Sequence, residues 1–250
     1  MDKLENKEIE ELSKYRFAFS KHRSDLSVEM EELLEAETLQ RFLFMVQEKL
    51  NGPLHAAGSL FIKRYAFLAA LVLYAMTVFD KALNANIYNI SLEIDDNDPF
   101  WMPRFYFKSQ EIKKAPEDRK TWRDLVLTSL FQNNISKLIQ IISKEAKISK
   151  ATLWENIAVY IFWMYETLLA ESKHENIHEK MKEDFVYCVL QADGRLFGEY
   201  SKNPLAKYYG PKTYCKQDNQ YIRKRKTCCL FYLTNKESGR CSTCPKDGQF

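Results

Sequence analysis

Four of the six cysteines lie close together near the end of the sequence, at a spacing that could hold a metal. Cys228 and Cys229 are adjacent, and after eleven further residues Cys241 and Cys244 form a CxxC pair. Several thiolates at short spacing are the ligands of a structural zinc ion or of an iron–sulfur cluster. The identity of the metal therefore decides whether the chain transfers electrons or only stabilises its fold there.

Disulfide bonds do not suit these cysteines. Adjacent Cα atoms lie about 3.8 Å apart across a trans peptide, below the roughly 4.4–6.8 Å that an ordinary disulfide spans. The first residues also lack the apolar stretch of a secretory signal. We therefore expect a cytoplasmic protein, where such cysteine groups more often bind metal.

Zinc and iron–sulfur are the two alternatives for the metal. The ligands of a zinc knuckle are separated by at least two residues, as Cys241 and Cys244 are, whereas Cys228 and Cys229 are not separated at all. Adjacent side chains leave an extended chain on opposite faces, which suits a target containing two irons. The spacing favours iron–sulfur and leaves a zinc-stabilised binding or structural protein as the alternative.

The composition indicates a well-filled globular protein without a nucleotide or nucleic-acid site. Of 250 residues 46% are hydrophobic and 14% aromatic, and 37 basic residues nearly balance 34 acidic ones, for a net charge of +3. Nucleic-acid binders usually show a stronger, concentrated basic face, so we expect no nucleic-acid partner. Neither GxGxxG nor GxxxxGK[ST] occurs, so the chain lacks the usual glycine-rich loops for dinucleotides and nucleotides.

The first 200 residues should be mostly helical. Hydrophobic periodicity predicts helices at about 28–50, 57–83, 118–131, 133–147, 151–171 and 175–191. Ser27 is the expected N-cap of the first. The uncharged run from Tyr65 to Phe79 would reach only about 22 Å, short of the roughly 30 Å hydrocarbon core of a bilayer, so we expect a buried core helix and no transmembrane span.

Alternating apolar residues predict two antiparallel hairpins. One pairs about 87–95 with 103–108; the other pairs Lys212–Cys215 with Tyr221–Lys226 and leads into the cysteines, after which Leu230–Leu233 could add a strand. No repeat or linker is present. The expected fold class is α+β: a single domain over 1–250, mostly helical, with a helical body over 1–200, a small antiparallel β-sheet and a cluster-binding segment at about 201–250.

Two other motifs could carry chemistry. The basic run 223–226 is either a solvated sheet edge or a set of cations beside an anionic cluster, with Arg223 and Arg225 on one face. His174 and His178 match HExxH, but they lie at a helix junction between charged residues, which predicts a solvated surface rather than a zinc protease.

The C-terminal motif resembles a known family. RKTCCLFY at 225–232, followed by CSTC at 241–244, is similar to the C-terminal signature of the FhuF-like ferric-siderophore reductases, written CC-x10-CxxC. This chain has eleven residues between the pairs where the family has ten. Weaker similarities to the same family are Ser59-Leu60-Phe61, Leu153-Trp154-x-Asn156 and Asn203-Pro204-Leu205.

The resemblance implies a [2Fe–2S] cluster bound by Cys228, Cys229, Cys241 and Cys244. It also implies one-electron reduction of an imported ferric siderophore in the cytoplasm, with electrons from an external ferredoxin-like or flavodoxin-like donor. Arg223 and Arg225 are the predicted contacts for an anionic chelate. An iron–sulfur electron carrier or sensor is the remaining alternative within this class.

Overall fold

The computed structural model describes residues 3–22, 24–98, 101–215, 219–234 and 239–246. Its α-helices are α1 Asn6–Ser13, α2 Ala36–Leu50, α3 Leu54–Phe79, α4 Arg119–Leu127, α5 Ser136–Glu145, α6 Lys150–Ala170 and α7 His178–Val186. Its strands are β1 Val28–Glu29, β2 Lys81–Leu83, β3 Ile90–Glu93, β4 Arg104–Phe107, β5 Ile112–Lys114, β6 Thr213–Cys215 and β7 Gln220–Ile222.

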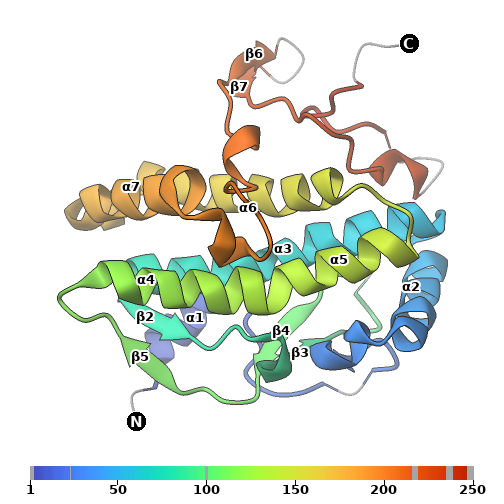
Figure 1. Ribbon diagram of the computed structural model, residues 1–250, viewed down its shortest axis with the longest axis horizontal. Coiled ribbons are helices and arrows are strands. Elements are labelled where there is room, and N and C mark those ends of the chain that lie inside the picture. Colours follow the sequence, from blue (N-terminus) through green and yellow to red (C-terminus); the bar gives the residue numbers. More distant parts are fainter. Residues whose placement is uncertain (1–2, 23, 99–100, 216–218, 235–238, 247–250) are drawn as a thin grey trace.

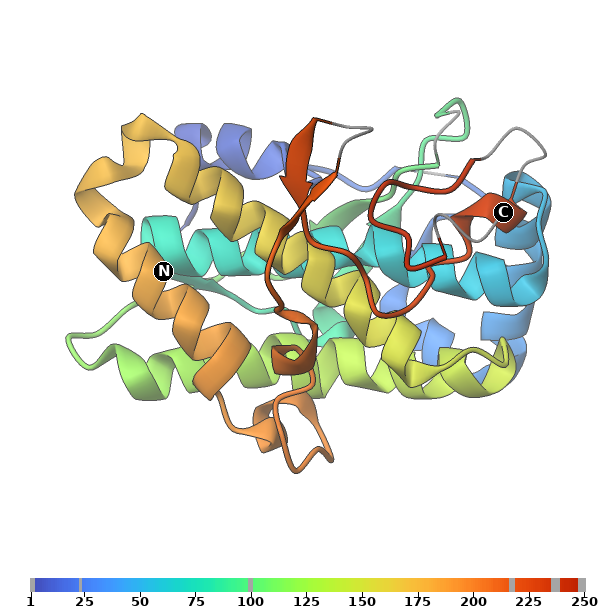
Figure 2. The same ribbon diagram turned by 90° about the horizontal axis from the view of Figure 1, so that it is seen from above.

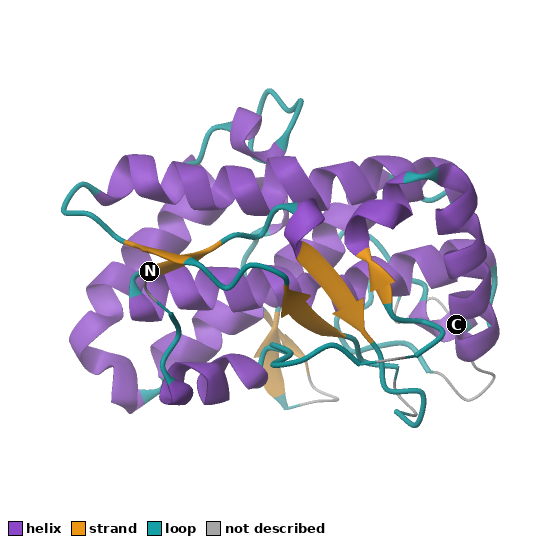
Figure 3. Cartoon of the chain, turned by 90° about the horizontal axis from the view of Figure 1, so that it is seen from below, coloured by secondary structure: helices purple, strands orange, loops and turns teal. Residues whose placement is uncertain are grey.

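The helices form two layers, and the C-terminal segment lies on the outside of one of them. Figure 1 shows α6 and α7 above α3 and the α4–α5 helix, with the segment that carries β6 and β7 on top of α6. Seen from below, the other short strands cover the opposite face of the helices (Figure 3). Every sheet is antiparallel, in the orders β1-β3-β4, β2-β5 and β6-β7. The α+β class is confirmed, with several small sheets in place of one.

Helix α3 is the centre of the core. Nearly all its side chains from Ala56 to Thr77 are buried, and it packs along α6. By length and composition α3 could cross a membrane, but 83% of its most apolar window is buried inside the protein. The predicted core helix is therefore confirmed. It ends earlier than expected because Asp80 adopts a left-handed conformation (φ 53°), and Lys81–Leu83 then pairs with β5.

The predicted helix over 28–50 was wrong in its first third. Val28 and Glu29 pair with β3, a 3₁₀ turn covers Met30–Leu34, and α2 begins only at Ala36. Ser27 is not a helix cap, because its hydroxyl accepts the backbone N–H of Ile94 at 3.1 Å. Tertiary pairing across 67 positions thus replaces the local capping signal.

Helices α4 and α5 form one rod where two separate helices were predicted. A π-helical stretch, Thr128–Ile135, joins them without a break. The polar Asn134 can be fully buried inside this rod because its amide accepts from the Tyr65 hydroxyl at 2.8 Å and donates to the Ala85 carbonyl at 2.7 Å.

Both predicted hairpins are present, and the predicted third C-terminal strand is not. Ile90 faces Phe107 in the first hairpin, and Thr213 faces Ile222 in the second, which is shorter than expected. The segment predicted as a strand at 230–233 is instead a 3₁₀ turn, Phe231–Leu233, entered through Leu230 in a left-handed conformation (φ 66°). This turn bends the chain directly after the vicinal cysteines.

Close packing of α3 against α5 gives a stability prediction at Gly58. A Cβ there would lie 2.8 Å from the Ala146 Cβ and 3.2 Å from the Ile142 Cγ2. We expect Gly58→Ala to lower the free energy of unfolding, because overpacking costs about 1–3 kcal/mol against a gain in helix propensity of about 1 kcal/mol. Gly210→Ala, where nothing lies within 4 Å, is the control and should change little. Urea unfolding followed by circular dichroism measures both, and an unchanged midpoint for Gly58→Ala would contradict the packing described.

Candidate metal centre

The four clustered cysteines lie together on the outer side of the helical layers. Seen from above, the C-terminal segment crosses α6 and folds back near the start of α3 (Figure 2). Cys228 and Cys229 follow the β6–β7 hairpin. Cys241 and Cys244 lie in one tight turn, in which the Cys244 N–H donates to the Cys241 carbonyl at 2.8 Å. Residues 235–238, within the longer spacer, lie outside the described residues.

The sulfurs are arranged in two pairs, each joining one cysteine from each half of the motif. The Sγ atoms of Cys228 and Cys244 are 3.8 Å apart, and the thiols of Cys229 and Cys241 are close enough for each to shift the pKa of the other. Within the described ranges no three cysteine, histidine or acidic side chains converge to hold one ion. Two pairs fit a cluster in which each of two irons takes two thiolates, better than one tetrahedral zinc.

The environment of one pair favours a thiolate. A hydrogen bond from Cys241 lowers the pKa of Cys229 to about 5, and the positive charges of Lys63 and Arg225 act in the same direction against burial. The same hydrogen bond, together with burial, raises the pKa of Cys241 far above its usual range. Of the two thiols, Cys229 is therefore the one whose surroundings favour the thiolate that a metal needs.

Donors surround the sulfurs. The Leu230 N–H lies 3.4 Å from the Cys228 Sγ, and the Thr243 hydroxyl lies 3.6 Å from the Cys241 Sγ. The ammonium of Lys63, from α3, lies 3.8 Å from the Cys229 Sγ and also faces the ring of Phe231 at 5.6 Å. Hydrogen bonds and positive charge at the sulfurs stabilise the more negative, reduced state of an iron–sulfur cluster.

A buried carboxylate on α6 fixes the backbone just before the cysteines. Glu155 is 2% exposed, and its two oxygens accept the backbone N–H groups of Lys226 and Thr227, each at 2.6 Å. The Thr227 hydroxyl donates to it as well. The guanidinium of Arg225 lies 3.8 Å away and balances its charge. A carboxylate in this position satisfies donors that the loop could not satisfy itself.

A second chain of hydrogen bonds connects the cysteine loop to both central helices. Arg225 donates to the Asn156 side-chain oxygen at 2.6 Å, and the Asn156 amide donates to the Ser59 carbonyl at 2.9 Å. The Ser59 hydroxyl then donates to the Cys229 carbonyl at 2.8 Å. Ser59 and Asn156 both belong to the weaker sequence similarities to the family, and in the structure they anchor the cysteine loop.

Sequence reasoning missed Glu155 and Lys63 as site residues. Glu155 is a lone acid inside the apolar run LWENIAVYIF of α6, and a charged residue in such a helix needs a buried partner, which was the available signal. Lys63 gave no signal, because its proximity to Cys229 joins positions 166 residues apart.

Arg223 and Arg225 are less exposed than a solvated sheet edge would be. Arg225 is buried in the network described above. Arg223 donates to the Gly210 carbonyl at 2.8 Å, pairs with Glu166 at 2.8 Å and lies over the ring of Tyr209 at 4.5 Å. Their contact with a chelate stays a prediction.

The expected solvated surface holds for most of the HExxH motif but not for His174, since Glu175 is exposed and His178 is half-buried. His174 is buried in a 3₁₀ turn, with its Nε2 3.6 Å from a Glu171 oxygen and its ring against Tyr74. Burial lowers the pKa of His174. No zinc-binding group of three ligands forms around it among the described residues.

Comparison with known proteins identifies the family and the fold. The family model for "Ferric iron reductase FhuF-like transporter" matches residues 59–206, and that for "FhuF 2Fe-2S C-terminal domain" matches residues 225–246. Among solved structures, aerobactin synthetase IucA from a hypervirulent pathotype of Klebsiella pneumoniae is similar, with a TM-score of 0.52 and 12% identity over 72% of this chain and 37% of that one. The ATP-bound form of that synthetase has a TM-score of 0.50 and 13% identity over 72% of this chain and 36% of that one.

At this identity the likeness to the synthetase shows the fold alone, and the chain spans little more than a third of that protein's length. No curated protein matches the chain. The first family model covers more than half of the 250 residues, and the second covers all four clustered cysteines and begins at Arg225. The paired sulfurs fit the cluster that the second model describes. The chain therefore belongs to the FhuF-like ferric iron reductase family and carries its C-terminal [2Fe–2S] domain.

Proposed function

We propose that this protein reduces ferric siderophores by one electron, so that Fe(III) leaves its chelator as Fe(II). The observation that carries the proposal is the arrangement of the four cysteine sulfurs in two pairs. Buried hydrogen bonds hold the cysteine loop at the outer face of α6. When bound, a [2Fe–2S] cluster supplies one electron at a time. Oxygen-donor chelators hold hard Fe(III) much better than Fe(II), so this electron is sufficient to loosen the metal.

The pairing of the sulfurs supports one arrangement of the ligands. Cys228 and Cys244 would hold one iron, and Cys229 and Cys241 would hold the other. The spacer, one residue longer than in the family pattern, forms a slightly larger loop at little cost in closure entropy. Cys215 lies on β6 of the hairpin, outside both pairs.

The protein's own part is to hold the site, set its potential and receive electrons. Lys63 stabilises the added negative charge of the reduced site, while Leu230 and Thr243 donate to its sulfurs. The electron comes from an external ferredoxin-like or flavodoxin-like donor, since the sequence has no nucleotide-binding loop of its own. We propose the cytoplasm as the site of the reaction, because such donors and imported ferric siderophore meet there.

The metal content and electron transfer test the function directly. Protein purified without oxygen should be red-brown, with about two irons and two acid-labile sulfides per chain and no stoichiometric zinc. Chemically reduced protein mixed with a ferric siderophore should reoxidise, and an Fe(II) indicator should register the released iron. Zinc in place of iron would overturn the proposal. Reoxidation no faster than in buffer would favour an electron carrier or sensor.

Removing the charge of Glu155 should loosen the cluster. Glu155→Gln keeps the shape, but its amide would face the N–H donors of Lys226 and Thr227, and Arg225 would lose its buried partner. Breaking a buried charge pair costs about 3–5 kcal/mol. We expect a lower iron content and faster bleaching by an iron chelator. Glu171→Gln, at the C-cap of the same helix, is the control; equal retention in the two variants would rule out the anchoring role.

Lys63 should raise the reduction potential of the cluster. A unit charge about 4 Å away contributes about 1 kcal/mol even with the screening of water, equivalent to about 40 mV for one electron. Lys63→Met should therefore lower the midpoint potential by at least this amount, and Lys63→Arg should restore most of it. Redox titration followed by electron paramagnetic resonance measures both; identical potentials for the two variants would argue against an electrostatic effect.

A further inference from the structure

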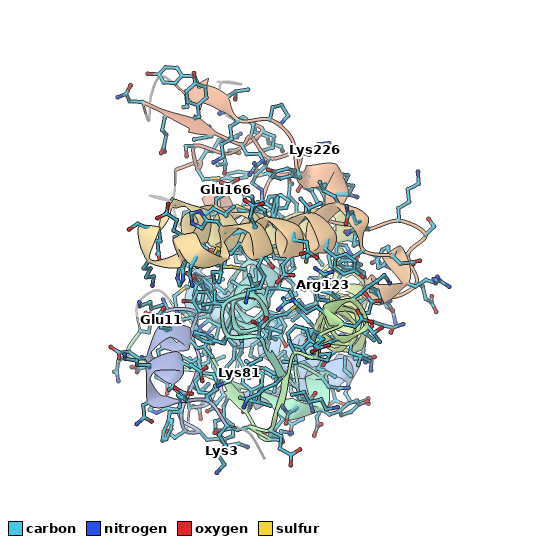
Figure 4. All side chains as sticks on the ribbon, turned by 90° about the vertical axis from the view of Figure 1, so that its left-hand side faces the viewer. Lys3, Glu11, Lys81, Arg123, Glu166 and Lys226 are labelled. Carbon is cyan, nitrogen blue, oxygen red and sulfur yellow. The ribbon has the colours of Figure 1, made fainter. Side chains whose placement is uncertain are left out.

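A cavity lies between the outer face of α6 and the C-terminal hairpin. Its volume is about 180 Å³, and its wall combines flat rings with basic side chains. The rings belong to Phe162, Trp163, Tyr208 and Tyr221, and the basic side chains include Lys212 and Lys224. Figure 4 shows Glu166 on the face of α6 that points toward the C-terminal segment, at this same place. Trp163 and Tyr221 are 44% and 68% exposed, so both rings are accessible from solvent.

The cavity has an excess of positive charge. Its wall contains four basic side chains and two acidic ones. Glu166 pairs with both Lys212, at 2.6 Å, and Arg223, at 2.8 Å, while Glu155 is committed to Arg225 and to the loop backbone. Glu166 thus shares one negative charge between two cations, and the Lys224 ammonium donates to the Ser242 carbonyl at 2.9 Å. Because the four basic side chains outnumber the two acidic ones, the wall attracts anions.

The cavity is also next to the cluster site. Thr243 is part of its wall, and the Thr243 hydroxyl lies 3.6 Å from the Cys241 Sγ. The Thr243 carbonyl accepts the backbone N–H of Arg225 at 2.9 Å, which fixes this wall residue against the anchoring network. A ligand in the cavity therefore touches a residue that touches a proposed iron ligand.

We propose that this cavity is the substrate site of the reductase proposed above, and that it takes one negatively charged oxygen-donor arm of an anionic ferric chelate. A volume of about 180 Å³ is below the roughly 300–1,000 Å³ of pockets that enclose a drug-sized ligand, so a whole siderophore does not enter. One arm enters, a carboxylate or a catecholate, and the iron stays at the mouth beside Thr243. A cluster held by the four cysteines would supply the electron that reduces Fe(III) to Fe(II), and the external donor would replace it.

Gallium(III) chelates separate binding from reduction, because gallium accepts no electron under these conditions. The probes are gallium citrate, a gallium tris-catecholate and the uncharged gallium complex of a trihydroxamate, titrated calorimetrically into the cluster-loaded protein. We expect the anionic complexes to bind at least tenfold more tightly than the uncharged one. Tighter binding by citrate identifies a carboxylate arm, and tighter binding by the catecholate identifies a catecholate arm. Equal affinity for all three, or no binding, would overturn the proposal.

Variants place the binding in this cavity. Lys212→Gln with Lys224→Gln should weaken the anionic gallium complexes about tenfold or more, whereas Lys14→Gln with Lys182→Gln removes the same charge elsewhere and should not. Val159→Phe, which fills the cavity from α6, should weaken binding without changing the net charge. Wild-type affinity in the Lys212 and Lys224 variant would refute the site.

The outcome for the reductase is read separately. If the Lys212 and Lys224 variant is reoxidised by ferric citrate as fast as the wild type, the chelate approaches elsewhere and only the cavity assignment fails. If reduced wild-type protein is not reoxidised by any ferric chelate, the proposed function itself fails, whatever the gallium titrations show.

Discussion

The structure of the C-terminal segment depends on one buried carboxylate. In its described residues that segment consists largely of loops and turns, with two short strands, so it depends on the helices for fixed hydrogen-bond partners. Glu155 supplies the fixed acceptor on which two consecutive N–H groups and a hydroxyl converge. Because Arg225 compensates its charge, a costly group in an apolar helix becomes the attachment point for the loop that carries the cysteines.

The packed helices of the core also fix the position of the cysteine loop. Helices α3 and α6 pack along each other, and both give the loop polar contacts: Ser59 from the first, and Asn156 together with Glu155 from the second. Lys63 is one turn beyond Ser59 on α3, so the helix that anchors Cys229 also places a cation beside its sulfur. The same two helices thus contribute both to the position of Cys229 and to the positive charge beside its sulfur.

The sequence alone predicted the parts of the protein that local pattern determines. The core helix expected over about 57–83 and both hairpins follow from periodicity, and the structure contains them. The metal site itself was predicted from the spacing of the four clustered cysteines. The anchors could not be found in this way, since Ser59 and Cys229 are 170 positions apart and Glu155 and Thr227 are 72 apart. The same limit explains Val28–Glu29, where a helical pattern yields to pairing with a strand more than sixty residues later.

The order of these anchors along the chain has a consequence for how the protein matures. Ser59 and Asn156 leave the ribosome long before Cys228, and the parts of a chain made first are generally the first to fold. Helices α3 and α6 can therefore be packed together while the cysteines are still being synthesised. Cofactor insertion is then a late step in biogenesis, performed on an otherwise finished protein, and a failure of the assembly machinery would leave a folded, colourless apoprotein rather than an aggregate.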